Sequence, residues 1–132
     1  MNYLSPLLQS SYQHKLLEYQ LKVLVTGATG HLGNNLVREL IHQNYEVRVL
    51  CRLGSDITPI KNLDVEIVNG DITDLTSLET ACKGIETVFH MASYISLMPF
   101  EKKKLYSINV DGMENVIQAC KKQGNIELIY MS

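Results

Sequence analysis

Apolar residues along the chain follow two alternating spacings from Leu21 onward. Short, largely β-branched apolar runs predict five buried strands, at residues 23–25, 47–50, 65–68, 88–91 and 128–131. Between these runs the apolar positions recur every three or four residues, which predicts helices over residues 32–43, 74–82 and 102–123. Residues 55–61 are too short and too close to Pro59 for more than one helical turn. Strands that are apolar on both faces need helices on both sides, so the pattern predicts a parallel sheet between two helical layers.

The alternation also predicts the topology. Parallel crossovers are nearly always right-handed, so the successive units build a doubly wound α/β sheet, a Rossmann fold, with strand order 3-2-1-4-5. This one domain covers residues 21–132. Residues 1–20 are a separate N-terminal extension, in which apolar side chains recur at helical spacing at Leu8, Tyr12, Leu16 and Tyr19. The extension is either an amphipathic helix docked on the domain or on a partner, or a frayed tail.

Composition narrows the range of partners. Hydrophobic residues make up 45% of the chain and charged residues 20%, as in a globular domain. The formal net charge of -2 provides no basic excess for nucleic acid. The apolar runs are far shorter than the roughly 20 residues that cross a bilayer, and residues 1–20 lack the features of a secretory signal. We therefore expect a cytoplasmic protein with neither a nucleic-acid nor a membrane partner. The three cysteines, Cys51, Cys82 and Cys120, lie in apolar runs and are expected to be reduced, packed thiols.

The segment between the first strand and the first helix carries the strongest chemical signal. Its sequence over residues 26–33, Thr-Gly-Ala-Thr-Gly-His-Leu-Gly, has three regularly spaced glycines. Such glycines permit a tight turn, let the backbone approach a pyrophosphate and let helix and strand pack closely. The helix N-terminus then offers N–H groups and the positive end of its dipole to the phosphates. The pattern predicts a dinucleotide site rather than a simple strand end, formed by Gly27, Thr29, Gly30, His31, Leu32 and Gly33.

The end of the second strand indicates which dinucleotide binds. A carboxylate there accepts hydrogen bonds from the adenine ribose, whereas an arginine pairs with the 2′-phosphate of NADP. Cys51 and Arg52 occupy this position, and the nearest carboxylate, Asp56, comes later. The sequence therefore favours NADP, with NAD as the alternative if Arg52 is an ordinary solvated surface residue.

Two later segments are expected at the same edge of the sheet. Asp71 follows the third strand, where it can receive the adenine amino group or cap the next helix. Ala92 and Ser93 follow the fourth strand, and their small side chains would let the backbone approach the nicotinamide ribose. His90 is expected to be a hydrogen-bonded structural histidine. No metal-ligand grouping accompanies it, so no metal site is expected.

Asn109 interrupts the apolar face of the last predicted helix, four residues from both Leu105 and Met113. A buried amide is costly unless its hydrogen bonds are satisfied, so Asn109 is expected to be buried with a defined partner. Gly112 in the same helix predicts close packing against the sheet. Both features are also compatible with a helix–sheet contact that has no function. The lysines at 102–104 are expected to form a solvated face without a partner.

Together these motifs resemble the extended short-chain dehydrogenase/reductase family, the NAD(P)-dependent epimerases and dehydratases, over residues 22–132. Residues 26–33 match the family's TGxxGxxG motif, and Gly-Asp-Ile at 70–72 resembles its adenine-contacting segment. Phe-His-Met-Ala-Ser at 89–93 is similar to the segment beside the nicotinamide, and residues 109–116 resemble the active-site asparagine helix. The resemblance implies further cofactor contacts from Ile72 and Met91 and a supporting role for Asn109. Among subgroups the chain is most similar to dihydroflavonol reductases and hydroxysteroid dehydrogenases, which reduce carbonyls with NADPH.

The catalytic groups of the family imply one further expectation. A Ser or Thr after the fifth strand and a Tyr-x-x-x-Lys pair on the next helix carry the family's chemistry, with tyrosine as general acid/base. Ser132 falls at the serine position, and none of the seven tyrosines has a lysine four residues later. The resemblance thus implies the NADP(H)-binding part of an oxidoreductase, epimerase or dehydratase for a carbinol–carbonyl pair, truncated before the catalytic helix and inactive by itself. The alternative is a non-catalytic dinucleotide-sensing or partner-binding module. Under either interpretation, the expected protein partner is a second copy of the chain or a missing C-terminal half, and the substrate stays undetermined.

Overall fold

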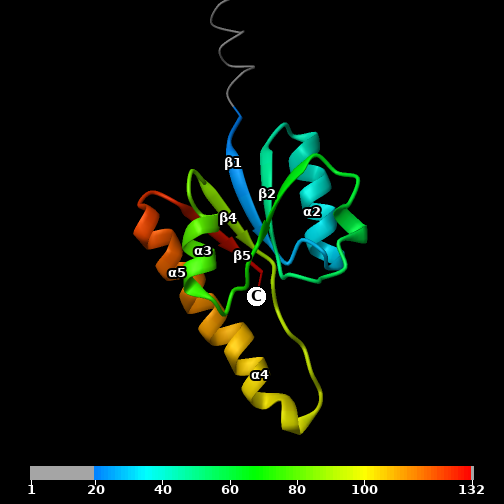
Figure 1. The fold of residues 1–132 in the computed structure, drawn as a ribbon, viewed down its shortest axis with the longest axis vertical. Coiled ribbons are helices and arrows are strands. Elements are labelled where there is room, and N and C mark those ends of the chain that lie inside the picture. The colour runs from blue at the N-terminus through cyan, green and yellow to red at the C-terminus, as the bar shows by residue number, and fades with distance from the viewer. Residues whose placement is uncertain (1–19, 132) are drawn as a thin grey trace, which may run out of the picture.

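The strands of the computed structural model, which describes residues 20–131, form one parallel sheet (Figure 1). They are β1 (Lys22–Thr26), β2 (Glu46–Cys51), β3 (Val65–Asn69), β4 (Thr87–His90) and β5 (Glu127–Tyr130). Their order, β3-β2-β1-β4-β5, confirms the predicted topology, and every predicted strand is found to within one residue at each end. The helix considered within residues 1–20 lies outside the described residues, apart from Gln20.

Helices cover both faces of the sheet. They are α2 (His31–His42), α3 (Leu75–Ala81), α4 (Lys102–Tyr106) and α5 (Gly112–Gln123), and residues 55–61 contain only the 3-10 turn Thr58–Ile60. α2 lies on one face and α3 with α5 on the other (Figure 1). Alternate side chains of β1 supply both cores, because Leu24 belongs to the α3–α5 cluster whereas Val23 and Val25 pack with α2. None of the helices in residues 20–131 is long and apolar enough to cross a membrane.

The predicted helix over residues 102–123 is divided by a π-helical turn, Ser107–Asp111, between α4 and α5. A π-turn has a wider hydrogen-bond spacing, so side chains four residues apart no longer share one face across it. Asn109 lies within this turn and is exposed, so the prediction that it is buried is wrong. Gly112 does pack closely, as predicted, but its neighbour is Ile72 in the loop after β3: a Cβ would lie 2.8 Å from the Ile72 Cδ1.

All three cysteines are buried and free, as predicted. Cys82 at the end of α3 and Cys120 in α5 share one apolar cluster. The hydrogen bond between their thiols and burial together raise the pKa of Cys82, so this thiol is neutral. These side chains serve as core packing between α3 and α5.

Candidate functional site

The turn between β1 and α2 places two glycines where only glycine fits. Gly27 has φ +71°, and a Cβ on it would lie 2.5 Å from the backbone nitrogen of Ala92. A Cβ on Gly33 would lie 1.9 Å from the carbonyl oxygen of Gly27. Backbone atoms thus occupy the space of a side chain at both positions. At Gly27 the turn therefore packs directly on the backbone that follows β4. At Gly33 the helix α2 packs directly on the turn.

Gly30 differs from the other two glycines of the motif. Its φ of -73° is one that any residue adopts, and a Cβ on it would meet only the Gly27 carbonyl oxygen, at 3.4 Å. No contact among the residues that the structure describes therefore demands glycine at this position. Gly30 borders a cleft instead, so the space that a Cβ would fill is open to a ligand that approaches the backbone.

The N-terminus of α2 opens onto the same cleft. Gly30 is the N-cap residue, and no side chain of the described residues caps the first turn. The amides of His31, Leu32 and Gly33 consequently have no partner within the helix, and all three residues line the cleft. A glycine turn followed by an open helix N-terminus suits the pyrophosphate of a dinucleotide.

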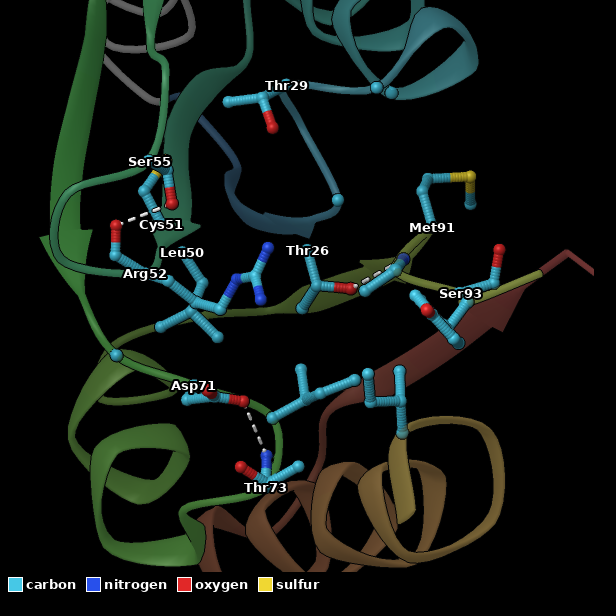
Figure 2. A pocket seen from close by; sticks show the side chains of 18 of the residues that line it. Thr26, Thr29, Leu50, Cys51, Arg52, Ser55, Asp71, Thr73, Met91 and Ser93 are labelled. Atoms are coloured by element: carbon cyan, nitrogen blue, oxygen red, sulfur yellow. Dashed lines mark hydrogen bonds between the residues drawn. The ribbon is translucent and has the colours of Figure 1, made fainter. Parts of the chain in front are cut away.

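The cleft has a volume of about 920 Å³ and lies where the strands end at the carboxyl edge of the sheet (Figure 2). Small-molecule sites commonly measure roughly 300–1,000 Å³, so a dinucleotide-sized ligand is within its capacity. All twelve residues predicted to contact the cofactor line this one cleft: Gly27, Thr29, Gly30, His31, Leu32, Gly33, Arg52, Asp71, Ile72, Met91, Ala92 and Ser93. The structure thus brings together four segments that lie far apart in the sequence.

Arg52 directly follows β2, and its side chain reaches into the cleft (Figure 2). Its carbonyl oxygen accepts hydrogen bonds from the Ser55 amide at 3.0 Å and hydroxyl at 2.6 Å, which fixes the turn after the strand. None of the ion pairs within residues 20–131 involves its guanidinium. Asp56 also lines the cleft, but its Oδ1 accepts hydrogen bonds from the amide and hydroxyl of Thr58, which lower the pKa of Asp56. The cation at the end of β2 is therefore available to an anionic ligand.

Asp71 lies at the end of β3 and faces the cleft rather than capping a helix. Its Oδ1 accepts a hydrogen bond from the Thr73 amide at 3.0 Å (Figure 2). Asp74 is the N-cap of α3, where its carboxylate accepts from the amides of Thr76 and Ser77 at 3.1 and 3.5 Å. The alternative prediction that Asp71 caps the next helix is thus wrong, because Asp74 is the N-cap of α3.

A buried hydrogen-bond chain joins β1 to the end of β4. The Ala92 amide donates to Thr26 Oγ1 at 3.2 Å, and Thr26 Oγ1 lies 2.7 Å from His90 Nδ1. Burial lowers the pKa of His90, which favours the neutral ring, and this ring shares a hydrogen bond with the Thr26 hydroxyl through Nδ1. His90 is a structural, hydrogen-bonded histidine, as predicted. These hydrogen bonds hold the Ala92 backbone next to Gly27, and the Ala92 backbone forms one wall of the cleft.

Asn109 has the defined partner that the sequence predicted, although it is exposed. Its side-chain amide donates to the Tyr94 carbonyl oxygen at 2.8 Å, and its Oδ1 accepts from the Tyr94 amide at 2.9 Å. Asn109 itself does not line the cleft, whereas Tyr94 does. The asparagine therefore acts on the site through the backbone that it holds.

Sequence reasoning missed several residues of the cleft wall, among them Thr26, Thr73, Tyr94 and Lys104. Thr26 could have been predicted, since it begins the glycine motif. Tyr94 and Lys104 belong to no motif, because only the loop between β4 and α4 brings them together. The Lys104 ammonium lies 4.3 Å from the centre of the Tyr94 ring. Ser132, the predicted catalytic serine, lies outside the described residues.

Comparison with known proteins agrees with this geometry. Residues 24–132 match the 3-beta hydroxysteroid dehydrogenase/isomerase family. Sterol demethylase protein B of Methylococcus capsulatus is 37% identical over 109 residues, which are 83% of this chain and 33% of that protein. A putative dihydroflavonol 4-reductase of Synechocystis is 38% identical over 108 residues, 82% of this chain and 31% of the relative.

Solved structures show the same fold. A short-chain dehydrogenase/reductase superfamily protein of Agrobacterium tumefaciens, crystallised with bound NAD, is 27% identical with a TM-score of 0.70. The match covers 83% of this chain and 31% of that protein. This chain thus spans about a third of the length of the relatives it matches.

Proposed function

Because the chain belongs to the 3-beta hydroxysteroid dehydrogenase/isomerase family of NAD(P)-dependent enzymes, we propose that residues 21–131 bind NADP(H). They would form the cofactor-binding part of an oxidoreductase that interconverts a carbinol and a carbonyl. The observation that carries the proposal is the geometry of Gly30. Its backbone faces a cleft and an open helix N-terminus, and no contact within residues 20–131 explains the missing side chain.

Each wall of the cleft has a role in this proposal. The amides of residues 31–33 bind the pyrophosphate, and Arg52 pairs with the 2′-phosphate that distinguishes NADP from NAD. Asp71 and Ile72 bind the adenine, while the backbone of residues 91–93 borders the nicotinamide ribose. The bound nicotinamide would supply or accept the hydride. No tyrosine here has a lysine four residues later, so the proposal assigns these residues cofactor binding and no proton transfer.

The names of the family and of one relative support a proposal for the substrate class. The matching family is named after 3-beta hydroxysteroids, and the name of one relative contains the word sterol. We therefore propose a sterol-like alcohol or ketone as the substrate of the whole protein.

The test of cofactor binding is a fluorescence titration of the chain with NADPH and, separately, NADH. Arg52→Ala removes the cation at the 2′-phosphate and should weaken NADPH about 10- to 100-fold, as expected for a charge-assisted hydrogen bond. NADH binding should change by no more than about twofold. Lys121→Ala removes the same charge from an exposed site on α5, away from the cleft, and should change neither affinity. Equal affinity of the wild-type chain for both cofactors, unaffected by Arg52→Ala, would refute the preference for NADP.

Gly30→Ala tests the site itself. Among the described residues beyond its chain neighbours, the nearest atom to the added Cβ is the Gly27 carbonyl oxygen at 3.4 Å, so the variant should fold with an unchanged melting temperature. It should nevertheless lose binding of both cofactors, because the methyl group fills the space of the pyrophosphate. Unchanged affinity in a folded Gly30→Ala protein would show that no phosphate approaches this turn.

A further inference from the structure

A tight turn directly after β2 brings a second charged residue to the cleft. The carbonyl oxygen of Arg52 accepts hydrogen bonds from the amide and the hydroxyl of Ser55, at 3.0 and 2.6 Å (Figure 2). Gly54 within this turn has φ +81°, the left-handed conformation that a type II turn has at its third residue. Because the chain reverses at this turn, Asp56 borders the same cleft as Arg52.

The carboxylate of Asp56 is held by Thr58 through only one of its two oxygens. Its Oδ1 accepts hydrogen bonds from the Thr58 amide at 3.0 Å and from the Thr58 hydroxyl at 2.5 Å. Within residues 20–131, no hydrogen bond or ion pair involves Oδ2. The hydrogen bonds from Thr58, with that of the hydroxyl first, lower the pKa of Asp56, so the carboxylate is charged at neutral pH. Thr58 thus orients an anion and leaves one of its oxygens available to a ligand.

Arg52 and Asp56 do not neutralise each other. Both residues are exposed and border one cleft, yet none of the ion pairs in the described part of the chain joins them. An ion pair between them would satisfy both charges within the protein. Because the two charges stay apart, this loop offers both a cation and an anion to a bound ligand.

We propose that Asp56 is a second determinant of cofactor choice and that it acts against Arg52. Its Oδ2 would accept hydrogen bonds from the adenine ribose hydroxyls of NAD(H), and its charge would repel the 2′-phosphate of NADP(H). The chain would then bind NADP(H) through Arg52 and NAD(H) through Asp56, and Asp56 would reduce the preference for NADP(H). This role rests on the proposed function, because it concerns the same cofactor site.

The position of Asp56 distinguishes it from Asp71, the other carboxylate among the described residues that line the cleft. Asp71 follows β3, where the proposed function assigns it to the adenine. The adenine is common to both cofactors, so Asp71 cannot tell them apart. Asp56 belongs to the same loop as Arg52, at the ribose, where the two cofactors differ. In the sequence Asp56 comes too late to occupy the position of the usual carboxylate, and only the turn returns it to the cleft.

Fluorescence titrations of Asp56→Asn with NADPH and with NADH test this role. Asparagine keeps the Oδ1 acceptor for Thr58 and removes only the charge, so the variant should melt as the wild type does. Its affinity for NADH should fall about 5- to 10-fold, because the ribose loses a charged acceptor. Its affinity for NADPH should rise about 3- to 10-fold, because the repulsion of the 2′-phosphate is gone. Two changes of opposite sign are expected, and a merely structural role would not produce them.

Three further variants separate charge from position. Asp71→Asn removes the same charge from the adenine side of the cleft and should change both affinities by a similar factor. Asp64→Asn removes it from an exposed position just before β3, outside the cleft, and should change neither affinity. Asp56→Glu keeps the charge but displaces the carboxylate by one methylene, so NADH should bind more weakly while NADPH gains nothing.

The binding of the wild-type chain separates this inference from the proposed function. If the wild type binds NADPH and Asp56→Asn changes neither affinity, or both in the same direction, the inference is overturned and the cofactor site stands. An equal shift of the NADPH-to-NADH ratio in Asp71→Asn would show that only the total charge of the cleft matters, which also overturns the inference. A wild type that prefers NADH, with the preference reversed by Asp56→Asn, would refute the preference for NADP and support the role of Asp56. A folded chain that binds neither cofactor would refute both.

Discussion

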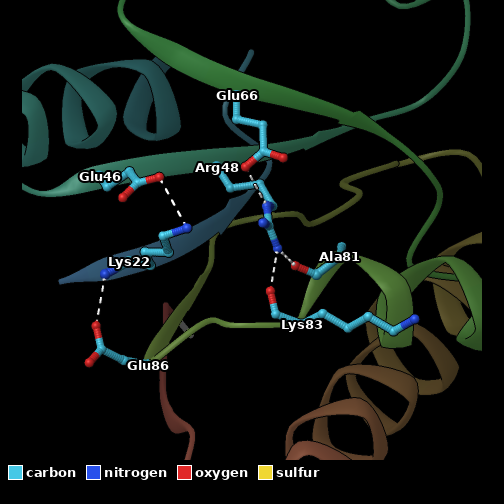
Figure 3. A network of polar contacts seen from close by, with 7 residues as sticks. All are labelled: Lys22, Glu46, Arg48, Glu66, Ala81, Lys83 and Glu86. Atoms are coloured by element: carbon cyan, nitrogen blue, oxygen red, sulfur yellow. Dashed lines mark hydrogen bonds and ion pairs between the residues drawn. The ribbon is translucent and has the colours of Figure 1, made fainter. Parts of the chain in front are cut away.

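Arg48 in β2 connects the sheet to the end of α3 by hydrogen bonds, and its replacement by methionine should destabilise the fold strongly. Its Nη1 donates to the carbonyl oxygens of Ala81 and Lys83 at 2.6 and 2.7 Å, and its Nε donates to Glu66 at 2.8 Å (Figure 3). The side chain is only 14% exposed. The guanidinium therefore satisfies carbonyls that α3 leaves open at its C-terminus, where a positive charge is also favoured by the helix dipole.

The magnitude follows from the burial of each partner. The bond to the part-buried Ala81 carbonyl is charge-assisted and contributes about 2 kcal/mol. The bond to the exposed Lys83 carbonyl contributes less, about 0.5–1 kcal/mol, because water replaces it readily. Glu66 is 54% exposed, so its ion pair contributes at most about 0.5 kcal/mol. Methionine keeps the apolar stem, and the expected loss is about 3 kcal/mol of the free energy of unfolding, or a melting temperature lower by about 12 °C.

Urea unfolding followed by circular dichroism measures this loss in Arg48→Met and two control variants. Glu66→Gln removes only the ion pair of Arg48 and should cost less than about 1 kcal/mol. Lys22→Met removes an exposed pair with Glu46, 3.3 Å apart on the same sheet (Figure 3), and should cost equally little. If Arg48→Met costs no more than Glu66→Gln, the contact with the end of α3 contributes nothing, and the reasoning is refuted.

Three further predictions concern other elements of the fold. Gly33→Ala should lower the free energy of unfolding by roughly 3 kcal/mol or prevent folding, because its Cβ would lie 1.9 Å from a carbonyl oxygen. Gly30→Ala should melt as the wild type does, so equal melting temperatures of the two variants would contradict this prediction. Burial lowers the pKa of His90, so the folded state should lose stability as pH falls below about 6.5, by up to about 1.4 kcal/mol per pH unit. His90→Asn should remove that part of the slope in urea titrations, and an unchanged slope would show that His90 does not cause it. Asp74→Ala should lower the free energy of unfolding by about 1 kcal/mol, because α3 loses its N-cap. Asp111→Ala is the control, since the Asp111 side chain makes no cap hydrogen bond to α5, and thermal melting should show a loss of less than about 0.5 kcal/mol.

The sequence by itself determined the layers, the strand order and the general place of the candidate site. Strand and helix periodicity are local signals, and the handedness of parallel crossovers converts them into a topology. Because parallel strands end at one edge, residues that follow the ends of β1, β2, β3 and β4 must meet there. The residues predicted from these strand ends do line one cleft, together with Ile72 and Met91, which the family resemblance implied.

Only the tertiary structure showed which glycine serves the fold and which is open to a ligand. The three glycines are equivalent in the motif, yet Gly27 meets Ala92 in the loop after β4, Gly33 meets Gly27, and Gly30 meets almost nothing. The tertiary structure also decided that Asn109 is exposed and holds Tyr94, and that Arg48 reaches the end of α3. These facts depend on distances between segments that are far apart in the chain. Periodicity and spacing are set by near neighbours in the sequence and contain no information about such distances.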